Sequence, residues 1–266
     1  MGFLAEIIER KRLSLERAKS LVRADELRAK ALDVRATAEP RRLRAALERN
    51  ERLNVIAEIK RASPSKGEIR AGADPAVIAH SYEEAGAAAT SVLTEEERFR
   101  GSLADLRAVR NAVRLPVLRK DFLFDEYQIY ESAAAGADAL LLIVAALEDE
   151  KLSRLLHMTE NELGMDALVE VHTSDELRRA LACGAKIVGV NNRDLHSFEV
   201  SLDVSAELAR NIPGNVLSVS ESGLHVRSDL DRLRSLGFRG FLIGESLMRA
   251  ADPGEALREL LGGKDG

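Results

Sequence analysis

Cysteine and tryptophan are almost absent from the 266-residue sequence, which has one Cys and no Trp. A single cysteine excludes an internal disulfide and a cysteine-based metal site, and it fits a reducing compartment. Cys183 lies in a segment rich in Ala, Leu and Gly, where we expect a buried small apolar residue. Without cross-links, the fold must depend on an apolar core.

Long hydrophobic runs and an excess of basic charge are also missing. The longest apolar candidate, 137–147, contains Asp138 and is shorter than the roughly 20 residues of a membrane span. Residues 1–12 lack the positive start and long apolar run of a secretory signal. The net charge is −5 and acids and bases are interleaved, so no basic face for nucleic acid or anionic membrane is visible. We therefore expect a cytoplasmic protein without nucleic-acid or membrane partners.

What is present is a repeat of short β-branched or Leu-rich runs, each followed by a polar loop and an amphipathic helical stretch. This alternation predicts βαβ units and a parallel sheet. Eight runs fit a strand, namely 54–60, 88–93, 116–120, 139–143, 167–171, 187–190, 216–220 and 240–243. Eight units predict a closed (β/α)8 TIM barrel of the α/β class, and at this length residues 1–266 are expected to form one domain.

Helices are expected between these strands, and several begin with Ser or Asp, which suits an N-cap. The expected starts lie near Asp74, Ser102, Asp125, Leu147, Ser174, Ser201 and His225, with a last helix over 244–261. Gly86, Gly136, Gly184 and Gly237 come just before strands, where glycine can end a helix in the left-handed conformation.

Residues 1–50 do not fit the repeat. Their pattern is helical, with Phe3, Leu4, Ile7 and Ile8 on one side and charged residues on the other. We interpret this segment as a helical extension packed on the barrel. Two roles are open: it plugs or caps the barrel, or it covers a ligand at the catalytic mouth.

Charged side chains gather at the ends of the expected strands, where a barrel of this kind carries its chemistry. Glu58 and Lys60 are two residues apart, so they lie on one face of their strand. Burial and nearby cations would lower a lysine pKa toward neutrality, and an apolar pocket would raise a glutamate pKa, which gives an acid–base pair at neutral pH. The other strand ends supply Lys120, Asp121, Glu170, His172, Asn191, Arg193, Asp194, Ser220, Glu221 and Ser222.

Each charged group also has a purely structural interpretation. Glu58 and Lys60 could form a solvated pair on an edge strand, although their apolar neighbours favour a strand covered on both faces. Lys120 could form a salt bridge with Asp121 or Asp125. His172 fits a supporting or surface position at least as well as a catalytic one, and we assign it no catalytic role.

A phosphate site is predicted from two glycine-containing loops after the seventh and eighth strands, 220–223 and 243–246. Barrels often bind phosphate at these loops, where backbone N–H groups face the anion. Gly223 and Gly244 allow the backbone to come close. Glu245 would supply only its backbone N–H, with its side chain pointing away. Further contacts could come from Ser63 and Lys66.

Taken in order along the chain, these motifs resemble those of indole-3-glycerol phosphate synthases. The resemblance covers nearly the whole chain, including the helical extension, although the Arg-rich segment 24–50 does not align residue by residue. The segments that carry it are IAEIKR with SPS (56–61, 63–65), LRKDF (118–122), LVEV (168–171), GVNNRDL (189–195), SESG (220–223) and FLIGESLM (241–248).

The resemblance implies a reaction on a small phosphorylated substrate without a metal or an organic cofactor. Such an enzyme converts 1-(2-carboxyphenylamino)-1-deoxyribulose 5-phosphate to indole-3-glycerol phosphate, with loss of CO2 and water. It implies Lys120 as the general acid and Glu170 as the carboxylate that manages proton transfer in the dehydration. Which oxygen each of Lys60 and Lys120 protonates stays open.

Further roles follow from the same resemblance. Glu58 would orient a lysine and bond a substrate hydroxyl, Asn191 would bond the reacting hydroxyl region, and Arg193 would meet the carboxylate that leaves as CO2. The apolar wall around the aromatic ring would be formed by Phe99, Phe122 and Leu142. The phosphate-binding positions would be Ser63, Ser222, Gly223, Gly244 and Glu245, with Glu221 as a further residue lining the site.

Three other functions are open to a phosphate-binding barrel. A phosphoribosylanthranilate isomerase would need a Cys/Asp acid–base pair, but Cys183 lies before the sixth strand and the first strand ends in Lys60. A tryptophan synthase α subunit would use Glu and Asp without a lysine pair and would need a partner subunit. A non-catalytic barrel would keep the phosphate site alone. The sequence leaves a monomer and a homodimer equally open.

Overall fold

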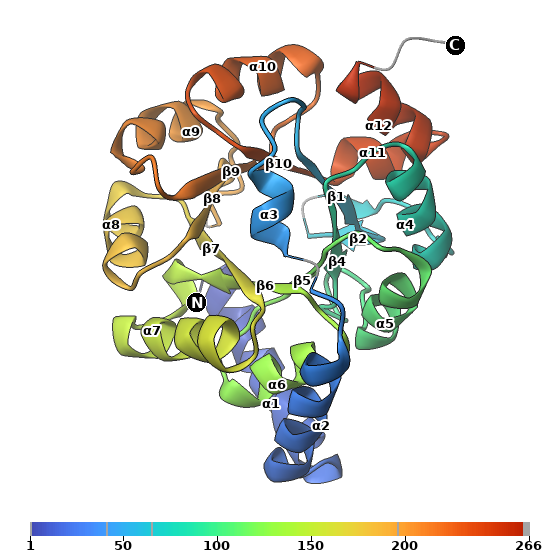
Figure 1. Cartoon of the computed structure of the whole chain (residues 1–266), viewed down its shortest axis with the longest axis vertical. Coiled ribbons are helices and arrows are strands. Elements are labelled where there is room, and N and C mark those ends of the chain that lie inside the picture. Colours follow the sequence, from blue (N-terminus) through green and yellow to red (C-terminus); the bar gives the residue numbers. More distant parts are fainter. Residues whose placement is uncertain (1, 41, 65, 196, 263–266) are drawn as a thin grey trace.

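The predicted barrel is present (Figure 1). The structure is a computed structural model that describes residues 2–40, 42–64, 66–195 and 197–262. Eight parallel strands close into a ring, and each begins and ends within one residue of its predicted limits. In order around the ring they are β1 (Val55–Ile59), β10 (Gly240–Ile243), β9 (Leu217–Glu221), β8 (Ile187–Asn191), β7 (Asp166–Val171), β6 (Ala139–Ile143), β5 (Val117–Lys120) and β4 (Ala89–Leu93).

Helices surround the ring of strands (Figure 1). The seven predicted starts between strands are confirmed to within two residues, and Asp74, Ser102 and Asp125 accept N-cap hydrogen bonds from backbone N–H groups. The helices are α4 (Pro75–Glu84), α5 (Leu103–Ala112), α6 (Glu126–Ala134), α7 (Asp149–His157), α8 (Ser174–Ala182), α9 (Asp203–Leu208), α10 (Arg227–Ser235), α11 (Glu245–Arg249) and α12 (Pro253–Leu261), with short helical turns η1 (Val144–Ala146), η2 (Met158–Glu162) and η3 (Ala209–Asn211).

The prediction of one last helix over 244–261 is wrong, because α11 and α12 are separate. Pro253 has no backbone N–H with which to continue a helix from α11. It instead begins α12, where the Asp252 side chain accepts a hydrogen bond from the Glu255 backbone N–H. The sequence therefore contained both a stop and a start signal at this point.

The glycine positions are confirmed, and one small element was not predicted. Gly86, Gly136, Gly184 and Gly237 have φ angles of 90°, 87°, 86° and 102°, in the left-handed region that favours glycine. After β1 the chain forms an antiparallel hairpin of β2 (Ala62–Ser63) and β3 (Gly67–Glu68). This hairpin lies beside the carboxyl end of β1 and becomes part of the site described below.

The N-terminal extension forms α1 (Phe3–Leu21), α2 (Ala24–Thr37) and α3 (Leu43–Leu47), and it fills the first of the two roles that the sequence left open, whereas covering a ligand stays a prediction. In Figure 1, α3 lies at the centre of the ring of strands, and its Leu43 and Leu47 join the apolar core inside the barrel. Helix α2 packs against α6. Phe3 at the start of α1 lines the pocket at the opposite end of the barrel. The extension therefore plugs one end and reaches the mouth at the other.

The core has two layers that follow the alternation of side chains along each strand. Ile56, Leu118 and Leu168 point into the barrel with the α3 leucines, whereas Val117 and Val169 pack outward with the helices. Cys183 is only half-buried, contrary to expectation, because it is the C-cap of α8. Among the described residues, no helix has the length and apolar character needed to cross a membrane.

Candidate active site

A cavity of about 420 Å³ opens at the carboxyl ends of the barrel strands. All eight strands contribute to it, since the last residue or the last but one of each lies in its wall. Apart from Leu142, every residue to which the resemblance gave a role in the site lines this cavity: Glu58, Lys60, Ser63, Phe99, Lys120, Phe122, Glu170, Asn191, Arg193, Glu221, Ser222, Gly223, Gly244 and Glu245.

Two ammonium groups meet three buried carboxylates on the floor of the cavity. The Lys60 Nζ lies 2.8 Å from the Glu58 Oε1, on one face of the chain as predicted. The Lys120 Nζ lies 2.8 Å from the Glu221 Oε2 and 3.3 Å from the Glu170 Oε2. The salt bridges predicted as alternatives for Lys120 are not the ones it forms. Asp121 pairs with Lys11 and Arg119 instead, and Asp125 pairs with Lys19.

The charges around Lys120 shift the pKa values of the cluster. Burial alone lowers the pKa of Lys120, but Glu221, Glu170 and Glu58 outweigh it and raise that pKa. The expected fall toward neutrality is therefore wrong. Burial raises the pKa of Glu221 to about 7, against the attraction of Lys120. The cluster thus combines an ammonium group that stays charged with a carboxyl group that titrates near neutral pH.

Glycines make room for two of these carboxylates. A Cβ at Gly189 in β8 would lie 2.1 Å from the Glu221 Oε1, and one at Gly244 would lie 2.4 Å from the Glu58 Oε1. Both contacts are far inside van der Waals distance, so a side chain at either position would displace a carboxylate. The other oxygen of Glu58 and the Oε1 of Glu221 are buried without a hydrogen-bond partner in the described residues.

Asn191 and its neighbours hold the side of the cavity formed by β7 and β8. The Asn191 Nδ2 donates to the Glu170 Oε1 at 3.2 Å, and its Oδ1 accepts from the Arg193 backbone N–H at 3.0 Å. The Arg193 guanidinium donates to the Phe198 carbonyl. His172 lies behind this layer, with its Nδ1 2.7 Å from the Asn191 carbonyl oxygen. His172 therefore lies outside the cavity wall, in a position that suits a supporting residue.

The predicted phosphate positions gather where β1, β9 and β10 end. Ser222 and Gly223 have φ angles of 68° and 76°, which turn the backbone sharply after β9. The Ser63 hydroxyl from the β2–β3 hairpin is buried, and it has no hydrogen-bond partner among the described residues. The Glu245 carboxylate lies 3.3 Å from the Arg249 Nε, and the expectation that this side chain points away from a bound anion stays a prediction.

The apolar wall of the cavity contains predicted and unpredicted residues. The rings of Phe99 and Phe122 lie 6.3 Å apart between centroids. The prediction of Leu142 is wrong by one residue, because β6 turns Leu141 and Ile143 into the cavity and Leu142 outward into the helix-facing core. The alternation from Leu141 to Ile143 was the signal that could have found them.

Two further aromatic residues in the wall could not be inferred from local patterns. Phe3 of α1 and Phe198 after β8 pack edge to face with their ring centroids 4.9 Å apart. They are far apart in the sequence, so only the docking of α1 brings them together. Within the described part of the chain, no group of three or more His, Cys, Asp or Glu could hold a metal ion. The expectation of a reaction without metal or cofactor stays a prediction.

Comparison with known proteins identifies the family. The family model for indole-3-glycerol phosphate synthase matches residues 4–260. The chain belongs to this family. It is 47% identical to the indole-3-glycerol phosphate synthase of Carboxydothermus hydrogenoformans over 97% of this chain and 99% of that protein. It is 49% identical to that of Koribacter versatilis over 97% of this chain and 98% of the other.

The solved structures similar to this one show the fold alone. The KGPDC of Streptococcus mutans has a TM-score of 0.61 at 14% identity, over 79% of this chain and 96% of that one. Indole-3-glycerol phosphate synthase is a decarboxylating lyase of tryptophan biosynthesis, and the family match selects it over the isomerase and α-subunit alternatives.

Proposed function

We propose that the charged cluster at the barrel mouth carries out the conversion of 1-(2-carboxyphenylamino)-1-deoxyribulose 5-phosphate to indole-3-glycerol phosphate. The observation that carries this assignment is the position of Lys120, which lies between the buried carboxylates of Glu221 and Glu170 in the cavity wall. An apolar wall lies on one side of the cluster and the phosphate positions lie on another. The cavity thus offers a place for each part of the substrate.

Ring closure forms a bond between the aryl carbon that bears the carboxylate and the carbonyl carbon of the sugar chain. The carbonyl oxygen becomes a hydroxyl, and the Lys120 ammonium supplies its proton. Loss of CO2 returns the bonding electron pair to the ring and restores its aromatic character. The raised pKa of Lys120 keeps it protonated for this step. A fixed ammonium group in a buried site also stabilises the negative charge that develops on the oxygen.

Dehydration then removes the new hydroxyl as water and a proton from the adjacent methylene carbon, which completes the indole. Glu170 is the proposed proton carrier for this step, and its Oε1 is held by the Asn191 amide at 3.2 Å. Lys60 is the second ammonium group at the site, and Glu58 orients it at 2.8 Å. Placed general acids and bases of this kind typically contribute about 10² to 10⁴ in rate.

The remaining predicted residues hold the substrate. The phosphate is proposed to bind at Ser63, Ser222, Gly223, Gly244 and Glu245. The unpartnered Ser63 hydroxyl supports this, because a buried donor without an acceptor is costly until a ligand supplies one. Phe99 and Phe122 face the aryl ring, and Arg193 lies where it can meet the departing carboxylate. Holding both ends of a flexible substrate brings the two reacting carbons together, an effect of several kcal/mol.

The test is to replace Lys120 by Met and to follow indole fluorescence in the presence of EDTA. We expect the turnover number to fall by at least about 10²-fold, since the proton donor is lost. Binding of a non-reacting analogue, in which the keto group is reduced to an alcohol, should persist. Lys186→Met is the matched control, because Lys186 is half-exposed and pairs with Glu160 away from the cavity.

Three results would contradict this proposal. Turnover close to the wild-type value in Lys120→Met would show that Lys120 is not the general acid. Loss of turnover only in EDTA would point to a metal. A wild type that binds the analogue without turnover would support the non-catalytic barrel.

We also propose that the protein acts in the cytoplasm as a monomer or homodimer without nucleic acid. Light scattering coupled to size-exclusion chromatography measures the oligomeric state.

A further inference from the structure

Phe99 and Phe122 lie on the loops that follow two neighbouring strands, β4 and β5. Each ring belongs to a loop rather than to a strand, so the barrel alone does not fix its position. A buried acidic residue stands near the start of each loop: Glu95 is 4% exposed and Asp121 is 2% exposed. Neither carboxylate takes part in the chemistry proposed above. Their hydrogen bonds show what they do in the fold.

Glu95 holds the backbone of the loop that carries Phe99. Its Oε2 accepts from the backbone N–H groups of Phe99 at 2.9 Å and Arg98 at 2.7 Å, and its Oε1 accepts from that of Glu97 at 3.1 Å. The Glu95 carbonyl accepts from the Gly101 N–H at 2.8 Å. One residue therefore fixes the backbone of the loop on both sides of Phe99.

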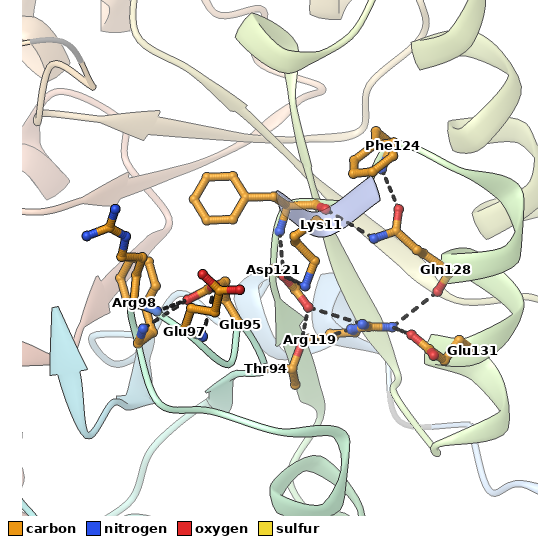
Figure 2. Close-up of polar contacts among 12 residues, drawn as sticks. Lys11, Thr94, Glu95, Glu97, Arg98, Arg119, Asp121, Phe124, Gln128 and Glu131 are labelled. Atoms are coloured by element: carbon orange, nitrogen blue, oxygen red, sulfur yellow. Dashed lines mark hydrogen bonds and ion pairs between the residues drawn. The ribbon is translucent and has the colours of Figure 1, made fainter. Parts of the chain in front are cut away.

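Asp121 does the same for Phe122 and is itself held by two cations. Its Oδ1 accepts from the Phe122 backbone N–H at 2.8 Å and lies 2.6 Å from the Lys11 Nζ of α1. Its Oδ2 accepts from the Arg119 guanidinium at 3.1 Å and from the Thr94 hydroxyl at 2.6 Å. Figure 2 shows Asp121 enclosed by Lys11, Arg119 and Thr94.

The two carboxylates belong to one network. Thr94 directly precedes Glu95 and donates to Asp121, so the starts of both loops are tied together. Helix α1 contacts both loops, since Lys11 pairs with Asp121 and Glu6 pairs with Arg98 at 2.6 Å. Figure 2 shows Glu95 and Arg98 to one side of Asp121, with Arg119 and Glu131 on its other side.

We propose that Glu95 and Asp121 are positioning residues that hold Phe99 and Phe122 in place for the aromatic ring of the substrate. This inference rests on the proposed function, because it takes the two rings as the wall for the aryl group. Hydrogen bonds to an ionised acceptor are roughly twice as strong as neutral ones, so a carboxylate holds a loop more firmly than an amide does. The network thus makes the enzyme selective for a substrate with an aryl group.

The variants Glu95→Gln and Asp121→Asn keep the side-chain size but put an NH2 group where one acceptor oxygen stands. Glu255→Gln and Asp203→Asn are the matched controls, since both are exposed acids paired with an arginine outside the cavity wall. Two non-reacting ligands are compared by calorimetry: the alcohol analogue of the substrate, and ribitol 5-phosphate, which has no aryl ring.

We expect Glu95→Gln and Asp121→Asn to bind the aryl ligand about tenfold more weakly, because one phenylalanine ring is displaced from the aryl group in each variant. Binding of ribitol 5-phosphate should change by less than about twofold, because the phosphate positions are untouched. Equal weakening of both ligands, or no weakening of either, would overturn the inference. Circular dichroism of each variant establishes that it is folded before the two ligands are compared.

A double-mutant cycle separates positioning from general stabilisation. If Glu95 acts through Phe99, adding Glu95→Gln to Phe99→Leu should weaken aryl binding by no more than about twofold beyond Phe99→Leu alone. Additive losses would contradict this. Wild-type turnover is measured in the same series. If the wild type shows no turnover, the proposed function is rejected. If the wild type turns over but the variants bind both ligands equally well or equally weakly, only this inference is rejected.

Discussion

The two ends of the barrel are built from opposite kinds of residues. At the mouth, Glu58, Glu170 and Glu221 are buried around two lysines, and some of their oxygens have no partner in the described residues. At the other end, Leu43 and Leu47 of α3 fill the barrel with apolar side chains. Buried polar groups without hydrogen-bond partners destabilise the folded state, whereas buried leucines stabilise it.

The way each end uses glycine shows the same contrast. Gly189 and Gly244 make space for carboxylates at the mouth, whereas a Cβ at Gly240 would lie 2.8 Å from the Leu47 Cδ2 at the plug. The plug is also tied to the strands by Asn54, whose Nδ2 donates to the carbonyls of Leu47 and Arg239, both at 3.0 Å. We infer that the plug stabilises the barrel and thereby allows the strained charge cluster at the mouth.

The largest effect that would test this contrast is on turnover at the mouth. Glu170→Gln removes the proposed proton carrier but keeps the side-chain volume, so kcat should fall by about 10² to 10⁴-fold. The free energy of unfolding should change by less than about 1 kcal/mol, because repulsion among three carboxylates is relieved while one hydrogen bond is lost. Steady-state kinetics and urea unfolding measure the two. A stable variant with normal kcat would remove Glu170 from the mechanism.

At the plug the opposite pattern is expected. Leu47→Ala leaves a cavity inside the barrel, and the free energy of unfolding should fall by about 2 to 4 kcal/mol. The kcat measured on the folded fraction should stay within about twofold, since the change is at the far end of the barrel from Lys120. Leu236→Ala, at an exposed leucine, is the control for a change of the same size. A stability loss as small as that of the control would contradict the role of α3.

The charge cluster should also give the protein a pH-dependent stability. The pKa of Glu221 is raised from 4.5 to about 7, so between these values the folded protein holds a proton that the unfolded chain has lost. The stabilisation is therefore full below pH 4.5 and is lost as the pH rises through 7.

Glu221→Gln should remove this dependence. Between about pH 5 and about pH 7, wild type should lose about 2 kcal/mol more unfolding free energy than the variant. Urea unfolding at the two pH values, with Glu207→Gln as an exposed control, measures the difference. Parallel curves for wild type and Glu221→Gln would show that Glu221 does not titrate in this range.

The smallest expected effect is at the proposed phosphate site. Ser63→Ala removes a buried hydroxyl that has no partner among the described residues, so the free protein should be no less stable. The KM should rise about fivefold, which corresponds to about 1 kcal/mol of lost hydrogen bonding to the phosphate. An unchanged KM would place the phosphate elsewhere.

The sequence predicted the barrel well because its signals are local. A parallel strand buried on both faces needs a continuous apolar run, and Gly86 or Gly136 marks the helix end before it, so strand limits were predicted to within one residue. The polar site residues were predicted for a related reason, since strand ends of a barrel converge by topology.

The errors concern contacts that local patterns do not contain. The resemblance placed Leu142 in the apolar wall, but one residue of register along β6 exchanges the two faces and brings Leu141 and Ile143 into the cavity instead. The meeting of Phe3 with Phe198 and of Lys11 with Asp121 depends on where α1 docks. The direction of the Lys120 pKa depends on how many carboxylates surround it, which only the structure shows.

The most direct test of this account measures turnover and stability together on one variant, Lys120→Met. The account predicts that kcat falls by at least about 10²-fold. It also predicts that the free energy of unfolding falls less than it does in Leu47→Ala, because the pKa of Glu221 rises further once Lys120 is gone, so that this buried carboxyl group takes up a proton. Turnover close to that of wild type, or a stability loss as large as that of Leu47→Ala, would contradict the division between a reactive mouth and a stabilising plug.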